Sequence, residues 1–385
     1  MYTINVIGAG TAGCFTVMYL AKNFPDKEIY WSFNDLDNNI GVGEATVPYV
    51  VEFLSKIGYN FNYLVDNCNA SLKLGIKFDN FSSKDFYHPF GNTEDEQNEL
   101  IYMCEKNKIP NNILDYKDIA CHFDVKTLIH DMYNQIKKIK NVHIINTKKH
   151  CNLKIDCTGF NSLKDTKYKQ CKHIQNNQAL IYRSNYTDDV KKIPYTLCTG
   201  LDNGWVWKIS LKDEVSYGYV NNGNKNNKKE FINYLKKNKI IFKEDNIRLI
   251  KFLNGRREKH LTESECHIGL SSSFIEPLES TGLYFTCYGI NKLGSYLNGD
   301  ITIDEYNQLF NNEFDSINNF IVAHYTRSDN NNLYWKEMRD IKYKITYTEF
   351  FPETSWKYII DGLDNGYKIN LTKNSKNILT GKKFN

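Results

Sequence analysis

Residues 3–13 read Thr3-Ile4-Asn5-Val6-Ile7-Gly8-Ala9-Gly10-Thr11-Ala12-Gly13, an apolar stretch followed by the spacing Gly-x-Gly-x-x-Gly. A helical pattern then continues to Asn23. Strand, glycine loop and helix in this order are the context that a dinucleotide-binding βαβ unit requires. In such a unit Gly8 permits the tight turn, Gly10 lets the backbone approach a pyrophosphate, and Gly13 lets the helix pack closely on the strand. The stretch therefore predicts an α/β fold that opens with a dinucleotide site.

The second predicted strand, Glu28 to Phe33, departs from the usual dinucleotide pattern. That pattern places an acid at the end of this strand to hold a ribose, but the position is occupied by Ser32 or Phe33. Asp35 follows in the loop. Ribose binding is therefore the part of the dinucleotide prediction that the sequence supports least.

Length and composition narrow the class of protein. With 385 residues, of which 41% are hydrophobic, the chain can bury a large core and form two to three structural units. The net charge of +4 is too small to indicate nucleic-acid binding. No apolar run approaches the length of a membrane span, and no basic and apolar leader precedes Thr3. We therefore expect a globular protein located in the cytoplasm.

The ten cysteines are scattered and contain no Cys-x-x-Cys pair. This spacing argues against zinc binding and dithiol chemistry, so we predict no metal site. In a chain without a predicted leader the cysteines read as reduced thiols, most of them small core residues.

A second informative stretch, Ser272 to Gly282, combines hydroxyls, acids, a proline and a glycine before an apolar helical pattern. Proline is tolerated near a helix start, and the free N–H groups there form a positive concavity suited to an anion. Glu279 would lie beside that anion. The simpler interpretation is an ordinary capped helix, in which Ser and Glu side chains satisfy the first N–H groups.

The segment Leu72 to Phe78 alternates strictly between apolar and other residues, which predicts one β-strand. Leu72, Leu74, Ile76 and Phe78 would face one way, and Lys73 and Lys77 the other. The simpler interpretation is a half-buried strand with both lysines in water. The alternative is that one lysine projects into a cavity.

The spacing of apolar residues in the rest of the chain predicts its further helices and strands. We predict an irregular polar region at 80–120, a helix from Val125 to Ile136 capped by Asp124, and strands at 143–146 and 153–159. Strands follow over 178–221, with Trp205 and Trp207 on one face of a strand, either as a packed pair in a core or as part of a site. Helices are predicted at 281–298 and 302–325. We predict a core unit of residues 1–335 and a short C-terminal unit of residues 336–385, with a polar tail from about Gly366.

Taken together, the patterns resemble the flavin-dependent halogenases of the tryptophan halogenase family. The resemblance rests on residues 8–13, 41–48, 71–78, 87–92, 122–124, 156–159, 204–209, 269–285 and 323–325, which follow one another in the family's order. It implies an FAD-binding Rossmann-like fold of the flavin monooxygenase type, with a mixed β-sheet substrate region and a helical C-terminal part.

The resemblance also implies roles for individual residues. FAD would lie along Gly8, Gly10, Thr11, Ala12 and Gly13, with Glu44, Ala45, Leu270 and Leu283 nearby. Thr281 and Gly282 match the halide site. Lys73 matches the lysine that carries or directs hypohalous acid, Glu279 the carboxylate that cooperates with it, and Ser280 its neighbour. Trp205, Trp207 and Ile209 match the Trp-x-Trp-x-Ile element, whose tryptophans discourage simple monooxygenation in the family.

The implied reaction uses FADH2, O2 and a halide ion. A flavin hydroperoxide would oxidise the halide to hypohalous acid, which Lys73 would deliver to an electron-rich aromatic or heteroaromatic substrate. Because the chain has one dinucleotide fingerprint and no second glycine loop, a separate flavin reductase would supply FADH2. Neither a nucleic acid nor a membrane is implied as a partner, and the chain could form a homo-oligomer.

The chain departs from the family in three respects. Ser210 stands where the Trp-x-Trp-x-Ile element is usually followed by proline, the ribose acid is missing, and the chain is shorter than members specific for tryptophan. The shortfall falls mainly after Trp335, where those members build much of the indole site. We therefore expect an open site for small free aromatics, with bromide and iodide preferred to chloride.

Two other interpretations remain open at this point. The same fold could belong to a flavin-dependent aromatic hydroxylase or monooxygenase, which would form its product without halide. A flavin-binding protein without catalysis is the third, but the presence of both Lys73 and Glu279 argues against it.

Overall fold

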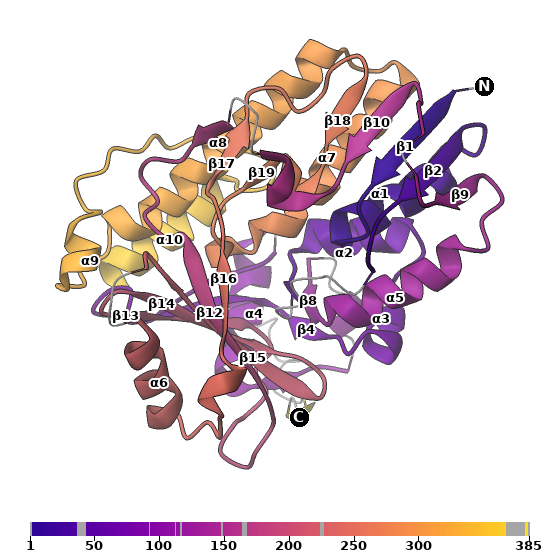
Figure 1. Cartoon of the computed structure of the whole chain (residues 1–385). Coiled ribbons are helices and arrows are strands. Elements are labelled where there is room, and N and C mark those ends of the chain that lie inside the picture. The colour runs from indigo at the N-terminus through magenta and orange to yellow at the C-terminus, as the bar shows by residue number, and fades with distance from the viewer. Residues whose placement is uncertain are drawn as a thin grey trace.

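The computed structural model describes residues 2–36, 44–91, 93–111, 113–115, 118–147, 149–163, 168–223, 227–366 and 382–383. Figure 1 shows two large sheets, a parallel one at the upper right and a mixed one at the lower left, with helices packed around and between them. Part of the stretch 41–48 quoted for the family resemblance, including Gly41 and Gly43, lies outside the described residues. So does most of the tail after Gly366.

The five-stranded sheet is entirely parallel and has the order β18-β10-β1-β2-β9. Its strands are β1 Thr3–Ile7, β2 Glu28–Ser32, β9 Val142–Ile145, β10 Leu153–Asp156 and β18 Glu265–His267. The glycine loop connects β1 to α1, Thr11–Asn23, as the opening stretch predicts. A β-carbon on Gly13 would lie 2.0 Å from the carbonyl oxygen of Gly8, so only glycine allows the helix to pack this closely.

The seven-stranded sheet is mixed and has the order β16-β12-β15-β14-β13-β5-β6. Its strands are β5 Gly75–Asp79, β6 Phe86–Pro89, β12 Gln178–Asn185, β13 Thr196–Leu201, β14 Gly204–Ser210, β15 Glu214–Asn221 and β16 Arg248–Lys251. Only the β13–β5 pair of this sheet is parallel. The strands predicted over 178–221 are thereby confirmed.

Three small sheets complete the β structure of the described residues. Their strands are β3 Glu44–Ala45, β8 Ala120–Phe123 and β4 Ser71–Lys73; β11 Tyr168–Gln170, β17 Gly255–Arg257 and β19 Ser273–Phe274; and β7 Lys108–Ile109 with β20 Lys382–Lys383. In Figure 1 the strands β4 and β8 lie between the two large sheets. They carry the chain from the dinucleotide half toward the mixed sheet.

Ten α-helices are assigned in the described part of the chain. They are α1, α2 Pro48–Lys56, α3 Phe61–Asn67, α4 Glu94–Lys106, α5 Val125–Ile136, α6 Asn227–Lys237, α7 Thr281–Asn298, α8 Ile303–Thr326, α9 Leu333–Lys336 and α10 Glu353–Asn365. The predicted helices at 125–136, 281–298 and 302–325 are confirmed within one residue, and Asp124 caps α5 by accepting a hydrogen bond from the Thr127 backbone N–H at 3.0 Å.

The prediction of an irregular region at 80–120 is wrong, because the region contains β6 and α4. Thr93 and Glu96 form a reciprocal capping box at the start of α4, and such caps stabilise a helix by about 1 kcal/mol. The helix also buries Leu100, Ile101 and Met103. The capping signal was present in the sequence, but the many polar residues around it concealed the helical period.

The prediction of one continuous strand from Leu72 to Phe78 is also wrong. The chain changes sheets at Leu74: β4 pairs with β8, whereas β5 pairs with β13 and β6. As a result the apolar side chains divide between two clusters, Leu72 and Leu74 in one and Ile76 and Phe78 in the other. An alternating pattern cannot show such a change, because both strands keep the same period.

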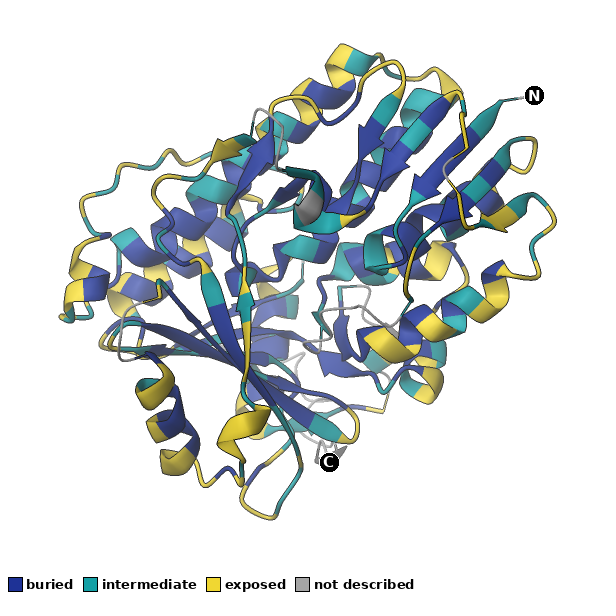
Figure 2. Cartoon of the chain, viewed as in Figure 1, coloured by how far each residue is buried: buried dark blue, intermediate teal, exposed yellow. Residues whose placement is uncertain are grey.

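The largest hydrophobic cluster of the described residues joins the parallel sheet, the central helices and one face of the mixed sheet, as the dark blue interior of Figure 2 shows. All ten cysteines belong to the described residues and are free thiols, and eight are buried, in keeping with the expected core role. Among the helices of the described residues, none combines the length and apolar composition needed to cross a bilayer.

Candidate functional site

The start of α7 offers an anion site without a side-chain cap. Pro277–Glu279 form a 3-10 turn, Ser280 adopts a left-handed conformation with φ 59°, and the helix begins at Thr281 with no side-chain hydrogen bond to its first turn. The interpretation as an ordinary capped helix is therefore wrong. The Thr281 hydroxyl is buried and has no hydrogen-bond partner within the described residues. A free hydroxyl at an open helix N-terminus fits the predicted halide site of Thr281 and Gly282.

Lys73 lies in the interior of the protein beside this helix start. Its side chain is fully buried at the end of β4, and its Nζ donates to the Thr46 carbonyl oxygen at 2.8 Å and to Ser280 Oγ at 2.9 Å. Burial lowers the pKa of the Lys73 amine to about 8, against the opposing charge of Glu279. A neutral, nucleophilic amine is therefore accessible near neutral pH. The interpretation that places both lysines in water is therefore wrong for Lys73, which lies in the protein interior.

Glu279 is held between two histidines. His88 Nδ1 lies 2.9 Å from Glu279 Oε2, and His324 Nε2 lies 2.9 Å from Glu279 Oε1. Burial alone would raise the pKa of the Glu279 carboxyl, but the charge of His88 and the hydrogen bonds of both histidines lower it to about 2. Lys73, through its hydrogen bond to Ser280 Oγ, and Glu279, the residue before Ser280, thus both lie at the helix start.

The sequence reasoning assigned no role to His88 or His324. Both lie in stretches that the resemblance quotes, 87–92 and 323–325, but no spacing in the sequence connects them to Glu279. His88 comes from β6 and His324 from the last turn of α8. Only the packing of α8 against the mixed sheet brings the two rings to one carboxylate.

The Trp-x-Trp-x-Ile element lies on β14 of the mixed sheet. Trp205 and Trp207 lie on one face of β14, as predicted, with ring centroids 6.2 Å apart, and both are buried, as is Ile209. Trp205 Nε1 donates to the Tyr325 hydroxyl at 2.9 Å, and Tyr325 in turn contacts Glu276. Trp205 is therefore connected through Tyr325 and Glu276 to the stretch that carries Glu279.

The residues predicted to bind FAD gather around the start of α1. Gly10 occupies the cap position of α1 without a side-chain hydrogen bond, so the N–H groups of Thr11, Ala12 and Gly13 begin an open helix N-terminus. The loop before Leu270 approaches Ala12, because a β-carbon on Gly269 would lie 2.6 Å from the Ala12 β-carbon. These groups fit the pyrophosphate of a dinucleotide.

The remaining predicted FAD residues lie on neighbouring elements. Glu44 and Ala45 form β3, half-buried against β8, and burial raises the pKa of the Glu44 carboxyl although Arg183 opposes the rise. Leu283 occupies the first turn of α7 and is buried. Ser32 Oγ at the expected ribose position donates to Asn5 Oδ1 at 3.3 Å, so the structure supplies no acid at the end of β2.

One cluster of possible metal ligands lies away from this site. Asp156, Glu265 and His267 place ligand atoms within 4.8 Å of one another on β10 and β18. The Lys154 amine already pairs with Glu265 at 2.6 Å, which places a positive charge where a cation would bind. A metal is therefore not part of our proposal.

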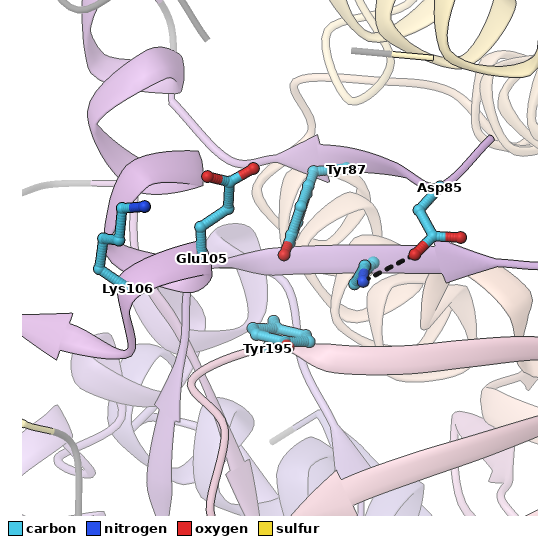
Figure 3. A pocket seen from close by; sticks show the side chains of 6 residues that line it. Asp85, Tyr87, Glu105, Lys106 and Tyr195 are labelled. Atoms are coloured by element: carbon cyan, nitrogen blue, oxygen red, sulfur yellow. Dashed lines mark ion pairs between the residues drawn. The ribbon is translucent and has the colours of Figure 1, made fainter. Parts of the chain in front are cut away.

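A polar cavity of about 420 Å³ lies on the other side of β5 and β6 and includes neither Lys73 nor Glu279. Figure 3 shows its lining, in which Lys77 forms an ion pair with Asp85 at 2.9 Å. Tyr87 and Tyr195 line its wall with an edge-to-face ring contact. Lys73, Glu279 and Thr281 are all buried, so these three side chains are shielded from water. The open substrate side expected from the short C-terminal segment stays a prediction.

The reactive end is covered by the segment after Trp335. Phe351 stacks on Phe320 with centroids 3.9 Å apart and lies 6.0 Å from the His88 ring, and α10 packs against β6. A short C-terminal segment therefore suffices to exclude water from Glu279.

The parallel sheet with its glycine loop, joined to a mixed sheet, defines an α/β protein with a Rossmann-like dinucleotide-binding fold. The fold matches BrvH, a flavin-dependent halogenase from Brevundimonas sp. BAL3, with TM-score 0.80 and 20% identity over 94% of this chain and 90% of that one. It also matches the tryptophan 6-halogenase SttH from Streptomyces toxytricini, with TM-score 0.82 and 23% identity over 96% and 91% of the two chains.

Sequence comparison gives the family. The tryptophan halogenase family model matches residues 3–122 and 124–357. Among its relatives, the tryptophan 7-halogenase KtzQ of Kutzneria sp. (strain 744) is 24% identical over 90% of this chain and 80% of its own length. RebH of Lentzea aerocolonigenes, also a tryptophan 7-halogenase, is 25% identical over 88% and 79%. The chain belongs to the tryptophan halogenase family, whose general chemistry is flavin-dependent halogenation.

Proposed function

We propose that this protein is an FADH2-dependent halogenase in which Lys73 and Glu279 direct hypohalous acid onto an electron-rich aromatic substrate. The observation that carries the proposal is the buried Lys73 amine and Glu279 carboxylate beside an uncapped helix start with an unpaired Thr281 hydroxyl. A buried charge is expensive, so two such groups beside an open anion site indicate chemistry rather than stability.

Each group in the site has a defined task. Bound FADH2, together with O2, supplies the oxidising equivalent that converts halide to hypohalous acid. The N–H groups and the Thr281 hydroxyl at the start of α7 hold the halide. Lys73 binds the hypohalous acid through hydrogen bonds or as a haloamine, since its Nζ is positioned by the Thr46 carbonyl and Ser280 Oγ. Glu279 polarises the oxidant or accepts the proton that the ring releases.

We propose small free phenols, indoles and azoles as substrates rather than tryptophan. Support comes from the segment after Trp335, where Phe351 and Trp356 are buried by packing against Phe320 instead of lining a wide indole pocket. A small pocket buries little ligand surface and so favours small rings.

The proposed activity is tested by supplying the full chain with FAD, a flavin reductase, NADH and each halide in turn, together with a panel of phenols, indoles and azoles. Product masses are expected to carry chlorine, bromine or iodine, with bromide and iodide giving the faster turnover. Products that gain oxygen at the same rate with and without halide would identify a hydroxylase and refute the proposal.

We further propose that FADH2 comes from a separate reductase, because the described residues contain one glycine loop of the dinucleotide type. Oxidised FAD mixed with NADPH and this protein alone is expected to keep its absorbance. Rapid bleaching without added reductase would contradict this part of the proposal.

A further inference from the structure

We propose that His324 is a positioning residue that keeps one exchangeable proton in its contact with Glu279, so that the pair lends a proton to the departing oxygen of hypohalous acid and recovers it from the substrate ring. The inference rests on the proposed halogenase function and assigns a new role within it. It comes from the hydrogen bonds of one buried imidazole.

The tautomer of His324 is determined by its backbone contact. His324 Nδ1 lies 2.8 Å from the carbonyl oxygen of Phe320, one turn earlier in α8. A carbonyl oxygen can only accept a hydrogen bond, so Nδ1 must carry a hydrogen. In a neutral imidazole the other nitrogen, Nε2, would then be an acceptor.

An unprotonated Nε2 of His324 would lie opposite another hydrogen-bond acceptor, the Glu279 carboxylate. His324 Nε2 lies 2.9 Å from Glu279 Oε1, and an ionised carboxylate can only accept. Two acceptors do not approach to 2.9 Å in a buried site without a proton between them. The contact therefore holds one proton, either as imidazolium and carboxylate or as imidazole and carboxylic acid.

The other polar and charged groups around Glu279 stabilise its ionised form, so the carboxylate readily gives up the shared proton. His88 on β6 faces both carboxylate oxygens with Nδ1, at 2.9 and 3.1 Å. Lys73 on β4 and the Cys198 thiol on β13 also feel the Glu279 charge. Since His324 and Glu279 are both buried, water does not compete for the proton.

With this shared proton, the atoms and charges of the halogen transfer balance. As the oxygen–halogen bond of hypohalous acid breaks, the halogen bonds to a ring carbon and Glu279 gives its proton to the departing hydroxide, which leaves as water. Glu279 then removes the proton from the same ring carbon, which restores the aromatic system and returns His324 and Glu279 to their initial state. The sum is hypohalous acid and arene giving haloarene and water, with no net use of protein protons.

The first experiment replaces the ring by an uncharged side chain of similar reach. His324→Gln can still donate to Glu279 but cannot supply a proton, so we expect halogenated product per O2 consumed to fall about 100-fold, in the range of lost acid–base catalysis. Flavin reoxidation should continue, releasing hydrogen peroxide. His260→Gln is the matched control: His260 is another fully buried histidine, bound to Ser272 Oγ and Asn311, and its loss should leave the ratio of product to O2 unchanged.

A double-mutant cycle separates this role from simple packing. If His324 acts only through Glu279, the variant carrying both His324→Gln and Glu279→Gln should be no slower than Glu279→Gln alone. Additive losses would show that His324 supports the fold and not the proton transfer, and would overturn the inference.

The proton itself can be observed without flavin or turnover. The full chain labelled with ¹⁵N in histidine and ¹³C in glutamate carboxyls should show, at pH 7, either two protonated nitrogens on His324 or a protonated Glu279. Loss of the histidine signal in His324→Gln assigns it. A neutral His324 ring beside an ionised Glu279 would refute the inference even if the wild-type enzyme halogenates its substrates, whereas absence of any halogenation would refute the proposed function alone.

Discussion

Lys73 and Lys77 lie four positions apart in one alternating segment, yet the structure gives them opposite surroundings. Lys73 is fully buried with its amine on Ser280 and Thr46, whereas Lys77 reaches a polar cavity on the far face of β5 and pairs with the partly exposed Asp85 (Figure 3). The difference arises at Leu74, where the chain leaves the small sheet of β4 and enters the mixed sheet. The same residue type is thus buried in one place and in contact with water in the other.

The comparison shows that burial, not the lysine itself, makes the difference. A displacement of the Lys73 pKa from 10.5 to about 8 corresponds to roughly 3 kcal/mol against the charged form. An exposed pair such as Lys77–Asp85 contributes at most about 1 kcal/mol. The protein therefore keeps an unfavourable charge in its interior at the position where the amine can react.

The largest expected effect separates the two lysines directly. Lys73→Ala is expected to abolish halogenated product, by more than about 10³-fold, while flavin reoxidation continues, because the group that holds the oxidant is lost. Lys77→Ala is the matched control and should keep wild-type turnover. Both are measured by product mass and O2 consumption, and equal losses in the two variants would overturn the assignment of Lys73.

The next effect concerns the carboxylate that faces Lys73. Glu279→Gln keeps the shape of the side chain but cannot accept a proton, so turnover is expected to fall about 100-fold. Substrate binding should change little if Glu279 acts mainly in the chemical step. Steady-state kinetics with bromide tests both statements, and wild-type turnover in this variant would remove Glu279 from the mechanism.

A third expected effect is a gain in stability: the variant Lys73→Met should have a larger free energy of unfolding than the wild type while losing activity. Lys73→Met removes the buried charge but leaves the Thr46 carbonyl without its donor, so the free energy of unfolding at pH 7 is expected to rise by about 2 kcal/mol. Urea denaturation of both proteins measures the difference.

The pH dependence of that gain follows from proton linkage. Below pH 8 both the folded and the unfolded wild type carry the Lys73 proton, so the full burial penalty is present. Between about 8 and 10.5 the folded state loses the proton that the unfolded state retains, so wild-type stability rises relative to the variant. The advantage of Lys73→Met should therefore shrink across this window, and a constant advantage would contradict the depressed pKa.

The smallest effect is expected from breaking the ion pair between Lys77 and Asp85. Asp85→Asn removes the charge that pairs with Lys77, and the free energy of unfolding should change by less than about 1 kcal/mol because both groups are partly exposed. Halogenation should be unchanged. A large loss of turnover would show that the cavity of Figure 3 belongs to the functional site.

The parts of the fold that the sequence predicted correctly have strong local signals. The glycine loop after β1, the Asp124 cap of α5, the paired tryptophans on β14 and the long helices α7 and α8 each follow from residue types at fixed spacing. Glycine, capping residues and periodic apolar residues restrict the backbone nearby, whatever the rest of the chain does.

The predictions from sequence were wrong where contacts between residues far apart in the chain determine the local structure. Helix α4 was hidden by its polar residues and is stabilised by burial of Leu100 and Ile101 in a cluster shared with Leu72 and Tyr87. The change of sheet at Leu74 depends on the partners β8 and β13, which lie far along the chain. Neither feature has a local period of its own.

The sequence by itself determined the class of the protein and most of the candidate site residues, because the glycine loop, the Lys73 segment and the stretch ending at Gly282 each carry their pattern in a few adjacent residues. The tertiary structure alone decided that Lys73 and not Lys77 is buried, that Thr281 begins the helix without a cap, and that His88 and His324 meet on Glu279. The physical reason is that pKa values and proton positions depend on burial and on partners from other elements, which no single stretch of sequence contains.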